Sequence, residues 1–204
     1  MADDVTLPGV ASVVATDEVD MGGGAAHVQM MKLVDATDGG TARIPGSAAK
    51  GLAVEPRSTV VRKAVTPTIT TSVYASGDAI GGIMEFTNAA RSSGQSIRVE
   101  AVQVADSASL GASMDLVLFD RNPGSGTFTD NSPADPTDAE LDTIVAVVPI
   151  GSYAGFSDNS VSDSPVERSM VLNGTSLFGV LVARSGPTYA ATDDITVTLT
   201  ILQD

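Results

Sequence analysis

The sequence contains no cysteine, no tryptophan and one histidine among its 204 residues. Without cysteine, disulfide bonds and thiolate metal sites are excluded. Aromatic residues make up 4% of the chain, which leaves few ring platforms for stacking against sugars. No run of about 18 apolar residues is present, so the sequence predicts no membrane-spanning helix and no membrane partner. Among the side chains that enzymes use for chemistry, these absences leave no thiol and a single imidazole.

Basic residues are also scarce, and they are unevenly placed. The formal net charge is −14. Residues 1–63 carry 8 acids and 6 bases, whereas residues 64–204 carry 17 acids and 5 arginines, and every lysine lies in the first part. A nucleic-acid-binding protein needs a basic face, so we expect no nucleic-acid partner. The asymmetry indicates two segments with different surroundings.

Residues 1–57 are rich in glycine, alanine and aspartate, and we interpret them as an extended N-terminal arm. The one convincing strand pattern in this arm is HVQMMKLV, at residues 27–34. Such a segment buries little apolar surface alone, so it is either a disordered tail or an arm that orders against a partner. In the second case, the candidate partner-binding residues are His27, Gln29, Met31, Lys32, Val34, Arg43, Lys50 and Arg57.

Residues 58–204 show short runs of strand-forming residues separated by Gly, Asn, Asp, Pro and Ser. In ITVTLTI, at 195–201, the apolar residues alternate strictly and should face a core. The strands are predicted at residues 59–63, 68–75, 81–87, 96–105, 114–119, 143–150, 168–172, 177–183 and 195–202. This spacing predicts an all-β fold, an antiparallel β-sandwich of the Greek-key or jelly-roll kind.

Two long connections, residues 120–142 and 151–167, interrupt the strands and favour a Greek-key or jelly-roll sandwich over an up-and-down barrel. Loops of this length are usually functional or disordered. A helical turn is predicted at 135–142, with Asp135 as its cap and Pro136 at its first position.

Candidate catalytic groups are sparse. His27 lies in the arm without a G-x-S-x-G motif anywhere to supply a nucleophile, so we predict a protein that is not an enzyme. We expect no cofactor. The acids of the first long loop are Asp120, Asp130, Asp135, Asp138, Glu140 and Asp142. They form either a solvated acidic surface or a calcium site, since calcium takes oxygen ligands from loops.

One stretch resembles a segment common in tailed-bacteriophage virion proteins. The resemblance rests on LFD at 118–120, NP at 122–123, TFTDN at 127–131, DAEL at 138–141 and IVAVV at 144–148. The arm sequence HVQMMKLVDATDGGTARIPG, at 27–46, is similar to phage structural proteins as well. The two segments cover around a quarter of the chain and contain no catalytic motif.

The resemblance implies a structural protein of the virion with a jelly-roll-like sandwich. Its implied role is a capsid decoration (cement) protein whose arm docks on the major capsid protein or another virion protein. Decoration proteins of this kind usually occupy three-fold sites, which implies a homotrimer located in the virion and assembled in the host cytoplasm. The alternative is a receptor- or carbohydrate-binding module of a tail tip, fibre or baseplate, with the long loops as its recognition surface.

Overall fold

The computed structural model describes residues 3–6, 13–20, 25–28, 46–47, 51–52 and 58–204. The chain divides into two compact units, Met1–Glu55 and Pro56–Asp204. Within the described residues, no helix is long and apolar enough to cross a membrane.

The N-terminal unit contains short antiparallel strands. Strands β1 (Asp3–Thr6), β2 (Val13–Asp20) and β3 (Ala25–Val28) form one sheet with β2 in the middle, and β4 (Gly46–Ser47) pairs with β5 (Gly51–Leu52). The strand predicted at 27–34 overlaps β3 at its first two residues, and residues 29–34 lie outside the described part of the chain. The sequence pattern did not predict β1 or β2.

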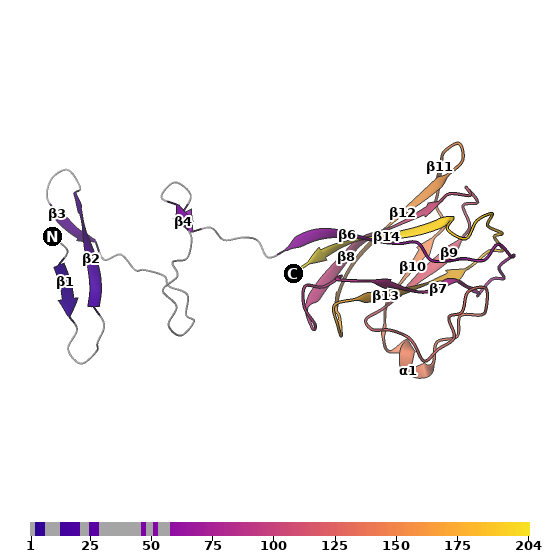
Figure 1. The fold of residues 1–204 in the computed structure, drawn as a ribbon, viewed down its shortest axis with the longest axis horizontal. Coiled ribbons are helices and arrows are strands. Elements are labelled where there is room, and N and C mark those ends of the chain that lie inside the picture. Colours follow the sequence, from indigo (N-terminus) through magenta and orange to yellow (C-terminus); the bar gives the residue numbers. More distant parts are fainter. Residues whose placement is uncertain (1–2, 7–12, 21–24, 29–45, 48–50, 53–57) are drawn as a thin grey trace. The chain divides into compact units, whose positions relative to one another are not determined.

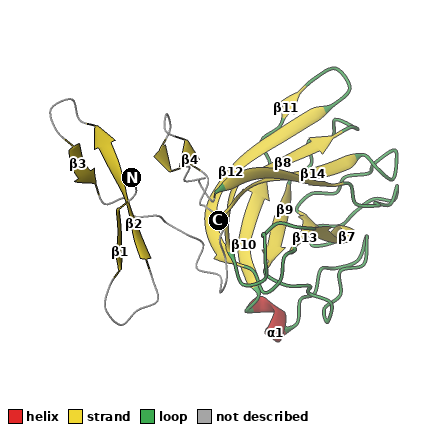
Figure 2. Cartoon of the chain, turned by 60° about the vertical axis from the view of Figure 1, so that its left-hand side comes forward, coloured by secondary structure: helices red, strands yellow, loops and turns green. Residues whose placement is uncertain are grey.

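The second unit is an all-β sandwich of two antiparallel sheets (Figures 1 and 2). One sheet contains β7 (Ala79–Phe86), β9 (Met114–Phe119), β10 (Ile144–Ile150) and β13 (Leu177–Ala183). The other contains β6 (Thr59–Val65), β8 (Ser96–Asp106), β11 (Ala154–Gly155), β12 (Ser160–Val171) and β14 (Ile195–Gln203). Their orders are β10-β9-β13-β7 and β11-β12-β8-β14-β6.

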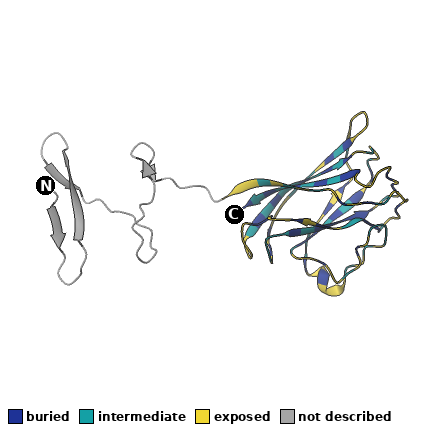
Figure 3. Cartoon of the chain, in the orientation of Figure 1, coloured by how far each residue is buried: buried dark blue, intermediate teal, exposed yellow. Residues whose placement is uncertain are grey.

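Side-chain alternation builds the core between the sheets. At residues 195–201 of β14 the apolar residues are buried and the threonines between them are partly exposed, which confirms the pattern predicted from the sequence (Figure 3). Burial of each valine, leucine or isoleucine side chain stabilises the folded state by about 1.5–3 kcal/mol. Strand β13 differs because six of its seven residues are buried. Leu177 and Leu181 face the main core, while Val180 and Val182 pack in a second cluster on the outer side of the four-stranded sheet.

The strand predicted at residues 68–75 was wrong. The structure has a loop there, although Ile69 and Tyr74 are each 1% exposed. Their backbone N–H groups donate to the carbonyl oxygens of Thr192 (2.9 Å) and Pro187 (3.0 Å), which lie in another loop. Two anchored apolar residues in a loop thus produced the pattern of a strand.

The long loop predicted at 151–167 was also wrong in its second half, which belongs to the twelve-residue strand β12. The sequence SVSDSPVE hid this strand because it is polar and contains Pro165. Proline removes a donor from a sheet and is tolerated next to a bulge. The pairing of β12 with β8 shifts register between Pro165 and Arg168, so the proline lies beside such an irregularity.

Candidate functional site

Residues 120–143, which connect β9 to β10, contain all six acids singled out in the sequence as a possible calcium site. The middle of this loop is fixed by Asp130, whose Oδ1 accepts hydrogen bonds from the Tyr74 hydroxyl (2.6 Å) and the backbone N–H of Gly81 (2.7 Å). Burial, followed by the hydrogen bond to Asp130, raises the pKa of Tyr74. The backbone N–H of Asn131 donates to the Ala79 carbonyl (2.9 Å), so the loop is joined to the start of β7.

Glu140 joins two parts of the same loop. It lies in helix α1 (Asp138–Leu141) and is 6% exposed. Its Oε1 accepts from the N–H groups of Ser125 (2.8 Å) and Gly126 (2.9 Å), and its Oε2 from the N–H (2.8 Å) and hydroxyl (2.9 Å) of Thr137. Burial acts to raise the pKa of Glu140, but the backbone hydrogen bonds from these three residues outweigh it, so the pKa lies below its ordinary value.

The helical turn predicted at 135–142 is confirmed by α1, but its predicted cap was wrong. Thr137 is the N-cap, and it forms a capping box with Glu140. Pro136 therefore precedes the helix instead of starting it. A serine or threonine followed three residues later by glutamate satisfies two free N–H groups at a helix start, which explains the choice of Thr137.

The loop covers part of the outer face of the four-stranded sheet. Phe128 from the loop packs edge to face on Phe119 of β9, with ring centroids 5.8 Å apart. These rings, together with Ala79, Val180 and Val182, form the second buried cluster. Gly126 allows the close approach, because a Cβ there would lie 2.6 Å from Glu140 Oε2 and 2.7 Å from the Asp135 carbonyl oxygen.

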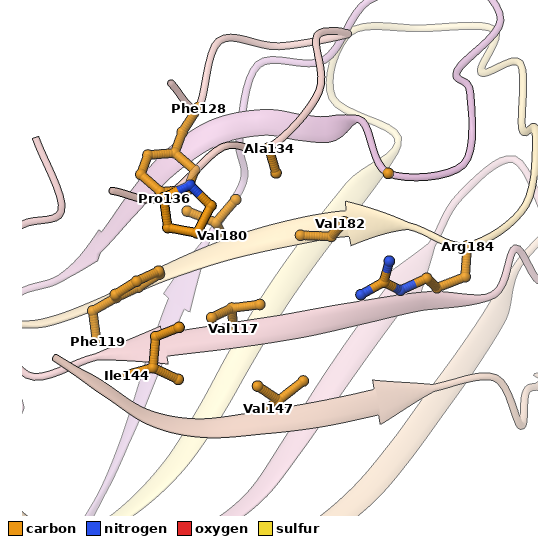
Figure 4. Close-up of a pocket in the computed structure, with 11 residues that line it drawn as sticks. Val117, Phe119, Phe128, Ala134, Pro136, Ile144, Val147, Val180, Val182 and Arg184 are labelled. Atoms are coloured by element: carbon orange, nitrogen blue, oxygen red, sulfur yellow. The ribbon is translucent and has the colours of Figure 1, made fainter. Parts of the chain in front are cut away.

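An apolar groove of about 270 Å³ remains beside this cover. We call it the outer groove, and Figure 4 shows its lining side chains over β9, β10 and β13. It is lined by Gly77, Val117, Phe119, Phe128, Ala134, Pro136, Ile144, Val147, Val180, Val182 and Arg184. Val147 is 54% exposed, so an apolar side chain in the middle of β10 faces solvent. At one end, the Nε of Arg184 pairs with Asp115 Oδ2 at 2.7 Å.

Three exposed aspartates lie within two residues of side chains that line the outer groove. Asp135 immediately precedes Pro136, Asp138 begins α1, and Asp142 lies two residues before Ile144. All three aspartates are exposed. All ion pairs that the structure describes lie within residues 58–204. None of these pairs includes one of the three aspartates. The groove therefore joins an apolar floor to a negative rim.

A second, polar hollow of about 220 Å³ lies between the start of the loop and the turn after β12. It is lined by Asp120, Arg121, Asn122, Asn173, Gly174, Thr175, Ser176 and Phe178. Arg121 Nε pairs with Asp120 Oδ1 at 2.9 Å. This hollow offers amides, hydroxyls and one partly exposed aromatic ring.

The loop carboxylates are used in different ways. Asp130 and Glu140 accept hydrogen bonds from neighbouring donors, and Asp120 pairs with an arginine. Across the part of the chain that the structure describes, no group of three or more His, Asp or Glu side chains is arranged to hold a metal ion. The structure thus gives the calcium interpretation no support.

The predicted partner-binding residues fall almost entirely outside the described part of the chain. His27 lies in β3, where the backbone alone is described. Gln29, Met31, Lys32, Val34, Arg43, Lys50 and Arg57 lie outside the described residues. The outer groove was missed by the sequence interpretation. Its signal was present in LFGVLVA and IVAVVPI, because runs without polar alternation indicate strands that are apolar on both faces.

Comparison of the sequence with models of known protein families, and with curated proteins, found no match. The function must therefore be argued from the residues and the geometry.

Proposed function

We propose that this chain is a non-enzymatic structural protein of a bacteriophage virion, most specifically a capsid decoration protein. The observation that carries the proposal is the structural role of residues 118–148, which resemble phage virion proteins. Phe119 and Phe128 form the cover of the sheet, Asp130 and Glu140 fix the loop, and the DAEL segment is helix α1. The residues that carry the resemblance thus build an anchored surface loop, as expected for a structural protein.

The strand order supports a jelly-roll form of the sandwich. Four antiparallel pairs join strands that are progressively closer in sequence, namely β6–β14, β7–β13, β8–β12 and β9–β10. They are divided between two sheets, with β6, β8, β12 and β14 in one and the other four in the second. Nested pairs divided in this way are the arrangement expected of a jelly roll, a form used by viral capsid domains and by lectins.

The charge distribution supports a division of labour between the two parts of the chain. The strongly acidic residues 64–204 suit a soluble body. Residues 1–57, which carry 8 acids and 4 bases and contain two of the three lysines, would dock on the major capsid protein or another virion protein. Three copies at a three-fold site would give the homotrimer, which a mass measurement in solution would detect.

To test the proposal, particles are purified from the host that makes this chain. Their protein composition is determined, and the same particles are imaged by electron microscopy. The expected result is a stoichiometric component with density on the outside of the head. Absence of the chain from purified particles would contradict the proposal.

The polar hollow favours a second candidate function, a carbohydrate- or receptor-binding module of a tail tip, fibre or baseplate. Asn122, Asn173 and the partly exposed Phe178 supply the amides and the ring that sugar recognition uses. A glycan array with the full chain would test this. Binding that is lost in Asn173→Ala would favour this function, and no binding at high concentration would exclude it.

A further inference from the structure

The outer groove is apolar and open on one side, so it suits a protein side chain. It encloses about 270 Å³, just below the range of about 300–1,000 Å³ that ligand pockets usually enclose. Its floor of Val117, Val147 and Ile144 is apolar. The residues that contribute most to binding at an interface cluster in well-packed pockets from which water is excluded.

The rim determines which partner fits. Asp135, Asp138 and Asp142 are exposed and lie within two residues of Pro136 or Ile144, which line the groove. The charge of Arg184 is offset by Asp115 at 2.7 Å. The groove is therefore surrounded by net negative charge, and a partner with lysine or arginine beside its apolar side chain would be complementary.

A second copy of the body fits less well. Residues 64–204 carry a net charge of −12, so two copies repel each other. A symmetric contact would also bring the same aspartates together. We propose that the outer groove is the surface through which the body binds a basic segment of the capsid protein, with one or two apolar side chains of that segment inserted over Val147. This inference rests on the proposed function, because it names the surface by which the body meets the particle.

The experiment measures binding of the full chain to particles assembled without it, at about 0.05 M and about 0.5 M salt. Val147→Asp places a charge on the groove floor, and its control is Val171→Asp, at a residue 60% exposed on β12. Asp135→Asn, Asp138→Asn and Asp142→Asn are combined to neutralise the rim. Their control combines Asp158→Asn, Asp163→Asn and Asp193→Asn, which are exposed elsewhere.

Val147→Asp should weaken binding about tenfold to a hundredfold, as expected for the centre of an interface, and Val171→Asp should not. The rim triple variant should bind more weakly at low salt and lose most of its salt dependence, unlike the control triple variant. Val147→Thr keeps the size of the side chain and should weaken binding several-fold, so the test stands even if Val147→Asp does not fold.

The outcomes separate the inference from the proposed function. If the wild type binds and the groove and rim variants bind equally well, the inference is wrong and the proposed function stands. If the wild type does not bind particles, both fail. If light scattering shows an oligomer of the wild type that Val147→Asp dissociates, the groove is an interface between copies, which also overturns the inference.

Discussion

Tyr74 and Tyr189 pack edge to face in the core, with ring centroids 6.2 Å apart, and both are 1% exposed. Their hydroxyl groups differ. The Tyr74 hydroxyl donates to Asp130, whereas the Tyr189 hydroxyl has no hydrogen-bond partner among the described residues. The sequence identified Asp130 as a loop acid, but its partner lies 56 residues away, so no local pattern predicted its role.

The two tyrosines form a matched pair for mutation. Tyr74→Phe should lower the free energy of unfolding by about 1–3 kcal/mol, because it leaves the Asp130 carboxylate without one of its donors. Tyr189→Phe should change it by less than about 0.5 kcal/mol, because it removes an unpaired hydroxyl. Urea unfolding followed by circular dichroism measures both. Equal losses in the two variants would show that Asp130 does not fix the loop through Tyr74.

Glu140 makes a prediction that depends on pH. Its pKa is below the ordinary value of 4.5, so the ionised form stabilises the fold. That contribution is complete above the unfolded pKa and is lost as the pH falls through the folded pKa. Glu140→Gln should therefore lower the Tm by a few degrees at pH 7, and the difference from wild type should shrink as the pH falls below about 4.5.

The matched control is Glu167→Gln, because the Glu167 side chain is 71% exposed and its closest approach to Arg98 is 3.8 Å. This variant should match the wild-type Tm throughout the same pH range. A difference for Glu140→Gln that stays constant down to pH 3 would contradict the role of the ionised carboxylate.

At the scale of elements, the loop after β9 serves as the cover of a second, smaller core. Phe128→Ala should lower the free energy of unfolding by about 3 kcal/mol, because it removes a buried ring and exposes Phe119. Phe156→Ala, at a residue that is 65% exposed, should have almost no effect. Chemical denaturation compares the two variants, and a similar small effect for both would mean that the loop does not cover the sheet.

Strands with a clear pattern were predictable. The predicted bounds of β9 and β13, 114–119 and 177–183, match the structure because both are dense apolar runs between turn residues. Strand β12 was half hidden because its inward-facing residues include Ser160 and Ser162, which are buried although polar. The outer groove was not predicted because it depends on which loop covers which sheet. Sequence periodicity indicates that a side chain is buried, but it does not indicate which element of the fold covers that side chain.

At the scale of the whole molecule, the two units predict separable roles. Deletion of residues 1–57 should leave a soluble sandwich with its thermal transition intact, because β6 to β14 and both hydrophobic clusters lie in residues 59–204. Under the proposed function, the same deletion should strongly weaken binding to particles, because the contacts of the arm are lost while the outer groove remains. Scanning calorimetry and particle sedimentation are the measurements. Insoluble protein, or normal incorporation into particles, would contradict this division.

The position of β14 in its sheet has a consequence for synthesis of the chain. This strand follows all others in the sequence, yet it lies between β8 and β6 and pairs with both. At about 5–20 residues per second, the ribosome needs on the order of ten seconds to proceed from residue 57 to β14. During that time the sandwich lacks a central strand and exposes its apolar interior. The negative charge of residues 64–204 makes unfinished chains repel each other. It therefore disfavours aggregation before the folded body exists.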